Sequence, residues 1–341
     1  MGKEYRAVCF DLDGTLLPMD IDEFLGAYFK DIAAYVARDG RDVEAFRAGF
    51  GAGVKAMTSN DGSRLNADAY WGAFFKHVGG DSGAWKAFLD TYYETEFGCI
   101  GEGVVANPSA ARAVNALVEK GYPVVLTTQP LFPETAVRQR VRWAGLDPQV
   151  FARITHYENS RSIKPKLRYY AEDLAACSLR GEDVLMVGNN TVDDLVFAGL
   201  GADVFLATDY LLNPVGVNMA RVAHGSMEEF ANWVETLPAC SHPAVSIERG
   251  SVAPDASEAA FAANVLPGVS DDAPLFAVER DVMEEGTSVS DGAAAAARAA
   301  VENGFAAGGA AGVDGSAAGG SVATGCFAAG GAAGAGEKVG A

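Results

Sequence analysis

The stretch AVCFDLDGT, from Ala7 to Thr15, decides the fold of this chain of 341 residues. Its first half is a short, continuously apolar run, which is typical of a strand buried on both faces of a parallel sheet. Two acids, Asp11 and Asp13, follow directly, and Gly14 permits a sharp turn. The stretch therefore predicts a buried strand that presents two carboxylates at its carboxyl end.

Further apolar runs predict more strands, and they alternate with segments of helical periodicity. The strands are expected at 5–13, 122–129, 152–158, 183–189 and 202–209. The helices between the later strands are expected at 108–121, 133–146, 165–177 and 191–201. This alternation indicates an α/β fold, a parallel sheet covered by helices on both faces.

The stretch between the first two strands has no strand pattern. Helices are expected there at 21–40, 42–57, 66–78 and 84–97. A helical insert in an α/β sheet is a second, smaller domain, expected over the carboxyl ends of the strands, where such sheets bind ligands.

Aromatic residues suggest two places where a pocket could form. The run Tyr70, Trp71, Phe74 and Phe75 has helical spacing, which favours a packed seam over a pocket. Phe132 follows the second strand, where a loop can present it to a ligand, although a packing role suits it equally.

The bulk composition excludes several classes of function. The formal charge is −19, the pI is near 4.6 and no basic cluster occurs, so we expect no nucleic-acid partner. No apolar run is long enough to cross a bilayer and the start lacks a secretory pattern, so we expect no membrane partner. The five scattered cysteines form no CxxC, which favours a reducing cytoplasm over a disulfide framework or a zinc site.

The composition changes near residue 240, from regular apolar periodicity to a Pro/Ser/Ala-rich stretch and then an Ala/Gly tract. Because Ala and Gly bury little apolar area, 241–341 is predicted to be a mostly disordered tail, with a marginal helix at 292–304. A partner-binding arm is the alternative. The remaining domains are expected as a core at 1–19 and 101–240 and a helical insert at 20–100.

Polar residues at the strand ends carry the expected chemistry. Asp11 can attack phosphorus, and Asp13 can protonate the leaving oxygen and then activate water. The hydroxyl of Thr128 can bind a phosphoryl oxygen, and Lys164, just before a helix, can neutralise the transferring group. Taken singly, each of these residues can be explained without chemistry: the aspartates by a polar turn, Thr128 by the strand, and Lys164 by an exposed surface.

In this order, followed by a strand that ends in Gly188 with acids behind it, these motifs resemble the haloacid dehalogenase superfamily over roughly residues 5–235. The resemblance implies a Rossmann-like core, a C1-type helical cap and Mg²⁺-dependent phosphoryl transfer. It implies Asp11 as nucleophile, Asp13 as general acid/base and Lys164 as the motif lysine. Asp13 and Thr15 argue against the dehalogenase branch.

The same resemblance implies the remaining site residues. Thr128 corresponds to the phosphate-binding hydroxyl, with Thr127 as the alternative. The residues expected to bind substrate are Gly14, Thr15, Thr127 and Gln129.

The stretch GNNTVDD, from Gly188 to Asp194, departs from the family pattern. The family usually has an acid directly after the glycine, whereas this chain has Asn189 and Asn190. The expected Mg²⁺ ligands are therefore Asp11, Asp13, Asn189 and either Asp193 or Asp194. Because hard cations are held largely by carboxylates, the substitution should weaken the binding of the ion.

The expected function is a cytoplasmic Mg²⁺-dependent phosphatase that hydrolyses a small phosphorylated metabolite through an aspartyl-phosphate. The alternative is a catalytically weak binding or regulatory protein for a phosphorylated ligand, and a phosphomutase is a third possibility. No sequence feature names the substrate or an oligomeric state.

Overall fold

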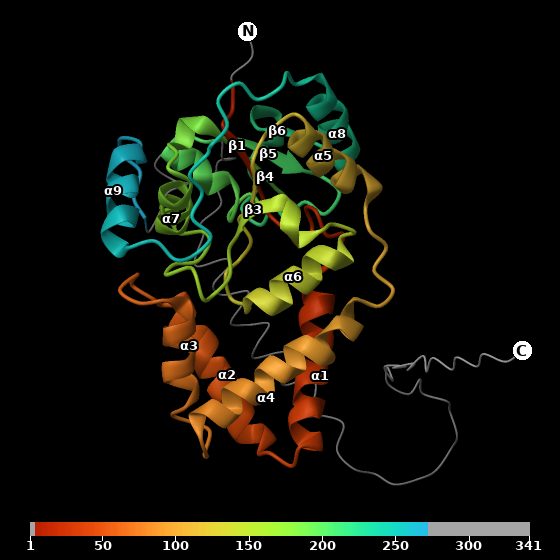
Figure 1. The fold of residues 1–341 in the computed structure, drawn as a ribbon, viewed down its shortest axis with the longest axis vertical. Helices are drawn as coiled ribbons and strands as arrows, with labels where there is room; N and C mark the ends of the chain where they lie inside the picture. Colours follow the sequence, from red (N-terminus) through yellow and green to blue (C-terminus); the bar gives the residue numbers. More distant parts are fainter. Residues whose placement is uncertain (1–3, 272–341) are drawn as a thin grey trace, which may run out of the picture. The chain divides into compact units, whose positions relative to one another are not determined.

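The computed structural model describes residues 4–271. A six-stranded parallel sheet, in the order β3-β2-β1-β4-β5-β6, forms its upper part in Figure 1, with α1 to α4 below. The strands are β1 (Ala7–Phe10), β2 (Val124–Leu126), β3 (Phe151–Ile154), β4 (Val184–Gly188), β5 (Asp203–Ala207) and β6 (Ala223–Gly225). Since β1 lies between β2 and β4, the residues that follow these three strands meet at one edge of the sheet.

Helices cover the sheet and fill the interval between β1 and β2. The α-helices are α1 (Ile21–Arg38), α2 (Val43–Thr58), α3 (Asn66–Phe74), α4 (Ser82–Thr95), α5 (Pro108–Glu119), α6 (Glu134–Trp143), α7 (Leu167–Cys177), α8 (Met227–Thr236) and α9 (Pro254–Asn264). The 3₁₀ helices are η1 (Phe97–Gly101), η2 (Pro148–Val150), η3 (Gly181–Asp183), η4 (Leu195–Leu200) and η5 (Met219–Arg221). Among the described residues, no helix is long and apolar enough to cross a membrane.

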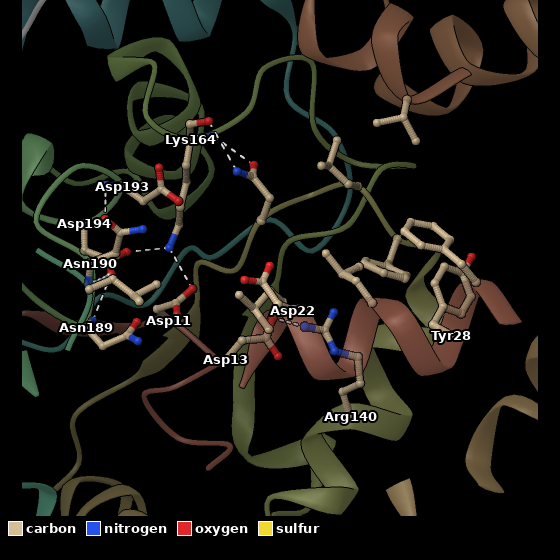
Figure 2. A pocket seen from close by; sticks show the side chains of 18 of the residues that line it. Asp11, Asp13, Asp22, Tyr28, Arg140, Lys164, Asn189, Asn190, Asp193 and Asp194 are labelled. Atoms are coloured by element: carbon tan, nitrogen blue, oxygen red, sulfur yellow. Dashed lines mark hydrogen bonds and ion pairs between the residues drawn. The ribbon is translucent and has the colours of Figure 1, made fainter. Parts of the chain in front are cut away.

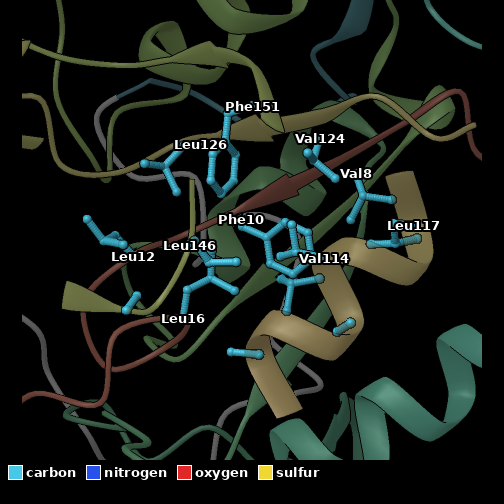
Figure 3. Packing of buried hydrophobic residues seen from close by; sticks show 14 of the residues in the cluster. Val8, Phe10, Leu12, Leu16, Val114, Leu117, Val124, Leu126, Leu146 and Phe151 are labelled. Carbon is cyan, nitrogen blue, oxygen red and sulfur yellow. The ribbon is translucent and has the colours of Figure 1, made fainter. Parts of the chain in front are cut away.

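One face of the sheet packs against α5 and α8. Successive strand residues point to opposite faces, so Val8 and Phe10 of β1 share this face. They pack with Val114 and Leu117 of α5 in one buried cluster (Figure 3). This layer fixes β1, and hence the position of the acids that follow it.

The other face packs against α7 and η4. Ala7 and Cys9 of β1 lie on this face, with Tyr170 of α7 and Phe197 of η4. The two aromatic rings stack with their centroids 4.3 Å apart. Together the two faces confirm the predicted parallel α/β sheet covered on both sides.

Helices α1 to α4 form an aromatic cluster that also takes in Ala136 and Tyr157 of the core, and the side chains of Tyr70 and Phe74 are buried in it. The two rings stack 5.7 Å apart, so the packing interpretation of this aromatic run is confirmed for them. The start of α3 is tied to the loop after β3, because the Asn66 side chain donates to the Ser162 carbonyl at 2.9 Å and its backbone N–H donates to Ser160.

Several elements differ from the sequence prediction, among them helix α8, which is not predicted. Strand β6 is not predicted, because it has only three residues and its first two are exposed. The helix expected at 191–201 is a turn followed by η4. The carboxylate of Asp194 turns back and accepts hydrogen bonds from the amides of Asn189 and Asn190, which favours a tight turn there over a regular α-helix.

The predicted tail is corrected over its first part, because 241–271 fold onto the core. Helix α9 packs against α7, and the backbone N–H of Ala244 donates to the Arg6 carbonyl at 3.0 Å. The buried guanidinium of Arg153 donates to the carbonyls of Glu248 and Gly250 at 2.8 and 2.5 Å. These hydrogen bonds supplement the sparse apolar area of the segment. The rest of the predicted tail and its marginal helix lie outside the described residues.

Candidate active site

A cavity of about 210 Å³ lies where the carboxyl ends of β1 and β4 face α1, α2 and α6 (Figure 2). It is lined by most of the polar residues that the sequence singles out, namely Asp11, Asp13, Gln129, Lys164, Asn189, Asn190, Asp193 and Asp194. Residues distant in sequence therefore meet in one space, as the strand-end pattern predicts.

Lys164 is the centre of the polar side of this cavity. Its ammonium lies 2.8 Å from Asp11 Oδ1 and 2.6 Å from Asp194 Oδ1, and the side chain is almost fully buried. Burial alone would lower the pKa of this ammonium, but the two carboxylates outweigh that effect and raise the pKa above its ordinary value. Lys164 is therefore positively charged at neutral pH.

Asp194 holds the loop after β4 in place. Its Oδ2 accepts from the backbone amides of Asn189 and Asn190, both at 3.0 Å, while Oδ1 accepts from Lys164. Burial raises the pKa of Asp194 to about 6, against the opposing effect of the lysine. A Cβ on Gly188 would lie 2.2 Å from the Asp194 carboxyl, so this close approach requires glycine. Both oxygens of Asp194 are thus committed to protein groups.

Asp193 is different, because its Oδ1 is buried and accepts no hydrogen bond within residues 4–271. Burial, followed by the charge of Asp194, raises the pKa of Asp193 to about 7. A buried carboxylate oxygen without a partner is costly unless it meets a cation or a donor. Of the two acids that the sequence leaves open as metal ligand, only Asp193 has such an oxygen.

The two asparagines have separate roles in the fold. Asn189 Nδ2 donates to the Tyr210 carbonyl at 2.7 Å, and its Oδ1 accepts from the Thr15 hydroxyl at 3.2 Å. Asn190 Oδ1 accepts hydrogen bonds from the backbone amides of Val192 and Asp193 and so stabilises the turn. Gly14 has φ +73°, and a Cβ there would lie 2.2 Å from Asn189 Nδ2. The surroundings of residue 189 therefore suit an asparagine, whose amide both donates and accepts a hydrogen bond there.

Arg140 is the principal residue that sequence reasoning misses. It lies on α6, is fully buried, and donates from Nη2 to Asp13 Oδ2. The guanidinium also lies over the rings of Phe24 and Phe132, at 5.0 and 4.9 Å from their centroids. The available signal is its place on the apolar face of α6, beside Val137 and Val141.

Phe132 itself lines the cavity and also packs against the insert, so both the pocket role and the packing role expected for this residue apply.

Burial lowers the pKa of Arg140 to about 10, which leaves the guanidinium charged at neutral pH. The ion pair thus places the positive charge of Arg140 against the Asp13 carboxylate.

The two threonines after β2 differ in their hydrogen bonds. The Thr127 hydroxyl donates to the Phe10 carbonyl at 3.2 Å. The Thr128 hydroxyl is buried and has no partner among the described residues, although Thr128 does not line the cavity. Gln129 does line it, and its amide is bonded to both backbone polar groups of Lys164, at 3.1 and 3.3 Å.

The oxygen atoms of this site suit a hard divalent cation. Mg²⁺ is usually held by one or two carboxylates together with substrate phosphate and water. Asp11 Oδ2, Asp193 Oδ1 and Asn189 Oδ1 are oxygens that neither Lys164 nor Arg140 takes up. Over residues 4–271 no group of three His, Cys, Asp or Glu side chains could hold a metal by itself. The set therefore fits a Mg²⁺ that the substrate helps to bind.

Comparison with known proteins gives a family match and distant structural matches. A family profile described as haloacid dehalogenase-like hydrolase matches residues 5–201, more than half of the chain. No curated protein matches the sequence of this chain.

Several solved structures are similar at low identity. A predicted phosphoglycolate phosphatase from Haemophilus somnus 129pt is 15% identical with a TM-score of 0.42, over 67% of this chain and 97% of that one. A HAD phosphatase from Thermococcus onnurineus is 17% identical with a TM-score of 0.43, over 70% and 100%. An L-2-haloacid dehalogenase is 18% identical with a TM-score of 0.40, over 68% and 100%. Likeness at this level does not choose between phosphatase and dehalogenase.

Proposed function

The chain belongs to the haloacid dehalogenase-like hydrolases, and we propose on that premise that it is a Mg²⁺-dependent phosphatase acting on a small phosphate monoester. The observation that carries the proposal is the buried bridge of Lys164 between Asp11 and Asp194 at the floor of the cavity. A buried cation beside a strand-end carboxylate can neutralise both the nucleophile and the incoming phosphoryl group.

Asp11 is the proposed nucleophile. One oxygen of its carboxylate attacks phosphorus as the bond from phosphorus to the alcohol oxygen breaks, while the Lys164 ammonium beside Oδ1 neutralises the charge. The aspartyl-phosphate is then attacked by water, which breaks the bond between phosphorus and the Asp11 oxygen. Inorganic phosphate leaves and the carboxylate is restored.

Asp13 is the proposed general acid and base. In the first step it gives its proton to the leaving alcohol oxygen, and in the second it takes a proton from water. Arg140 donates to Asp13 Oδ2 and fixes this carboxyl at the cavity, while Asp13 Oδ1 has no partner among the described residues and is the oxygen proposed to carry the proton. Arg140 is therefore a positioning residue for this step.

The phosphoryl oxygens are proposed to meet Lys164 and the unpartnered hydroxyl of Thr128. Thr127 is the weaker candidate, because the Phe10 carbonyl already accepts from its hydroxyl. Asp11, Asp193 and Asn189 would hold Mg²⁺, which supplies positive charge against the oxygens of the transferring group. Helices α1 to α4 are proposed to act as a cap that excludes water from the cavity.

A second candidate is a protein that binds a phosphorylated ligand with little turnover. The Arg140–Asp13 ion pair favours this candidate, because the pair restrains the carboxyl of Asp13. The amide of Asn189 also favours it, because a carboxylate at that position would bind Mg²⁺ more tightly.

The test is hydrolysis of 4-nitrophenyl phosphate across a Mg²⁺ titration, with wild type beside Asp11→Asn. A phosphatase shows activity that saturates with Mg²⁺ and falls at least about 1,000-fold in the variant, because the nucleophile is lost. Equal activity in the two proteins would refute Asp11 as nucleophile. Binding of phosphate esters without turnover in either protein would support the second candidate.

A further inference from the structure

The cavity has two chemically different sides. One side is the polar floor at the sheet edge, with Lys164 and the aspartates around it. The other side comes from α1, α2 and the loop after β2, and its apolar lining consists mainly of Ile21, Leu25, Phe29, Phe50, Val54 and Leu131. Figure 2 shows the labelled polar groups of the floor grouped apart from Tyr28 of α1.

Hydrogen-bonding groups on the apolar side are few, and two of them are already used. The Tyr28 hydroxyl is bonded to the Tyr93 hydroxyl at 2.6 Å. The Gln129 amide is bonded to the backbone of Lys164. The Asp22 carboxylate and the Arg140 Nε, which is buried and has no partner among the described residues, remain open to a ligand. Two open groups can meet only one or two hydroxyls, so a sugar or polyol with several hydroxyls against this wall would lose more hydrogen bonds to water than it regains.

The size of the cavity limits its occupant. At about 210 Å³ it lies below the roughly 300–1,000 Å³ typical of sites for drug-sized ligands. Once a phosphoryl group sits on Lys164, the space left against α1 and α2 suits one ring or a short branched chain.

We propose that the substrate is a phosphate monoester whose alcohol part is small, uncharged and apolar, such as a single carbocycle or a branched aliphatic chain. This inference rests on the proposed function, because it places the phosphoryl group at Lys164. The apolar wall gains from burying such a group, whereas each hydroxyl left unpaired costs roughly tenfold in binding or rate.

The experiment compares cyclohexyl phosphate with myo-inositol 1-phosphate, which has the same ring carrying five more hydroxyls. Both have alcohol leaving groups, so the comparison reports the wall more than leaving-group chemistry. We expect kcat/KM for cyclohexyl phosphate to exceed that for the inositol ester by at least about 100-fold. Leu25→Gln, which adds an amide to the wall, should shrink that ratio about tenfold or more. Val118→Gln on the exposed side of α5 is the matched control and should leave it unchanged.

A second readout separates the inference from the proposed function. Binding of each ester to Asp11→Asn is measured by calorimetry in the presence of Mg²⁺, where turnover is not required. Turnover with equal kcat/KM for the two esters would overturn the inference and leave the phosphatase proposal standing. Absent turnover with selective binding of cyclohexyl phosphate would overturn the phosphatase proposal and support the ligand class. Absent turnover and no binding of either ester would overturn both.

Discussion

Arg140 and Asp13 form an ion pair in which the arginine side chain is 1% exposed and the aspartate side chain 15% exposed. The arginine comes from α6 and the aspartate from the loop after β1, so the pair joins two segments more than a hundred residues apart. It also lies against the rings of Phe24 and Phe132, which link the insert to the core. The acid proposed to move protons is thus fixed by a residue outside the expected motifs.

Arg140→Met should lower both activity and stability. Loss of the guanidinium frees Asp13 from its position, and we expect kcat to fall about 100-fold with a smaller change in KM. Because the variant leaves a mostly buried carboxylate unpaired, the free energy of unfolding should fall by about 3 kcal/mol. Steady-state kinetics and urea unfolding measure the two effects. The double variant Arg140→Met/Asp13→Asn should regain part of the stability and none of the activity. Additive losses in stability would show that the pair is not coupled.

Lys164→Met should abolish turnover, because it leaves Asp11 and Asp194 facing each other without a cation. We expect a loss of at least about 1,000-fold in kcat/KM and about 3–5 kcal/mol in the free energy of unfolding. Lys120→Met is the matched control, since that ammonium bonds the carbonyls of Glu235 and Leu237 away from the cavity. A variant at 164 that behaved like the control would remove the basis for the proposed phosphoryl site.

Asn189→Asp should tighten the binding of Mg²⁺ by about tenfold, because it adds a carboxylate beside Asp11. It should also cost about 1 kcal/mol of stability, because the hydrogen bond to the Tyr210 carbonyl is replaced by two oxygens facing each other. Calorimetric titration with Mg²⁺ and thermal unfolding measure the two changes. Asn190→Asp is the comparison, since a carboxylate there can still accept from the turn amides, and its effect on Mg²⁺ should be smaller. Weaker Mg²⁺ binding in Asn189→Asp would contradict the ligand assignment.

Arg153→Met should destabilise the fold most strongly at neutral pH. Its guanidinium lies 3.0 Å from the buried carboxylate of Asp173, and we expect a loss of about 3–5 kcal/mol when that charge is left alone. Burial raises the pKa of Asp173, and Arg153 opposes that effect, so the variant has a still higher pKa. The folded variant then binds a proton more tightly than the unfolded chain, whose aspartate pKa is near 4. Its stability therefore falls as the pH rises through the folded pKa and recovers as the pH is lowered toward about 4.

Urea unfolding of Arg153→Met and of Arg153→Met/Asp173→Asn at pH 5, 6 and 7.5 checks this expectation. The difference between the two variants should grow with pH, and a constant difference would contradict it. Because Arg153 also bonds the carbonyls of Glu248 and Gly250, both variants should expose 241–271 to protease at lower concentrations than wild type.

The sequence alone predicts the parts of this protein that depend on local pattern. Buried strands need apolar runs, and a parallel sheet brings their carboxyl ends together, so Asp11 and the residues after Gly188 could be assigned to one site before any coordinates. The family resemblance added Lys164 to that site. The segment 241–271 escapes this reasoning. Its composition is poor in apolar groups, and the hydrogen bonds that hold it come from residues far away in the chain, among them Arg6 and Arg153.

Only the tertiary structure decides which partner each polar group takes. Sequence order leaves Asp193 and Asp194 equivalent, and the positions of Lys164 and of two backbone amides distinguish them. The pairing of Arg140 with Asp13 and the apolar wall over the site depend likewise on how α1, α2 and α6 pack against the sheet edge. Strand formation is set by neighbours in sequence, whereas charge pairing and cavity shape are set by side chains that meet only after the chain has folded.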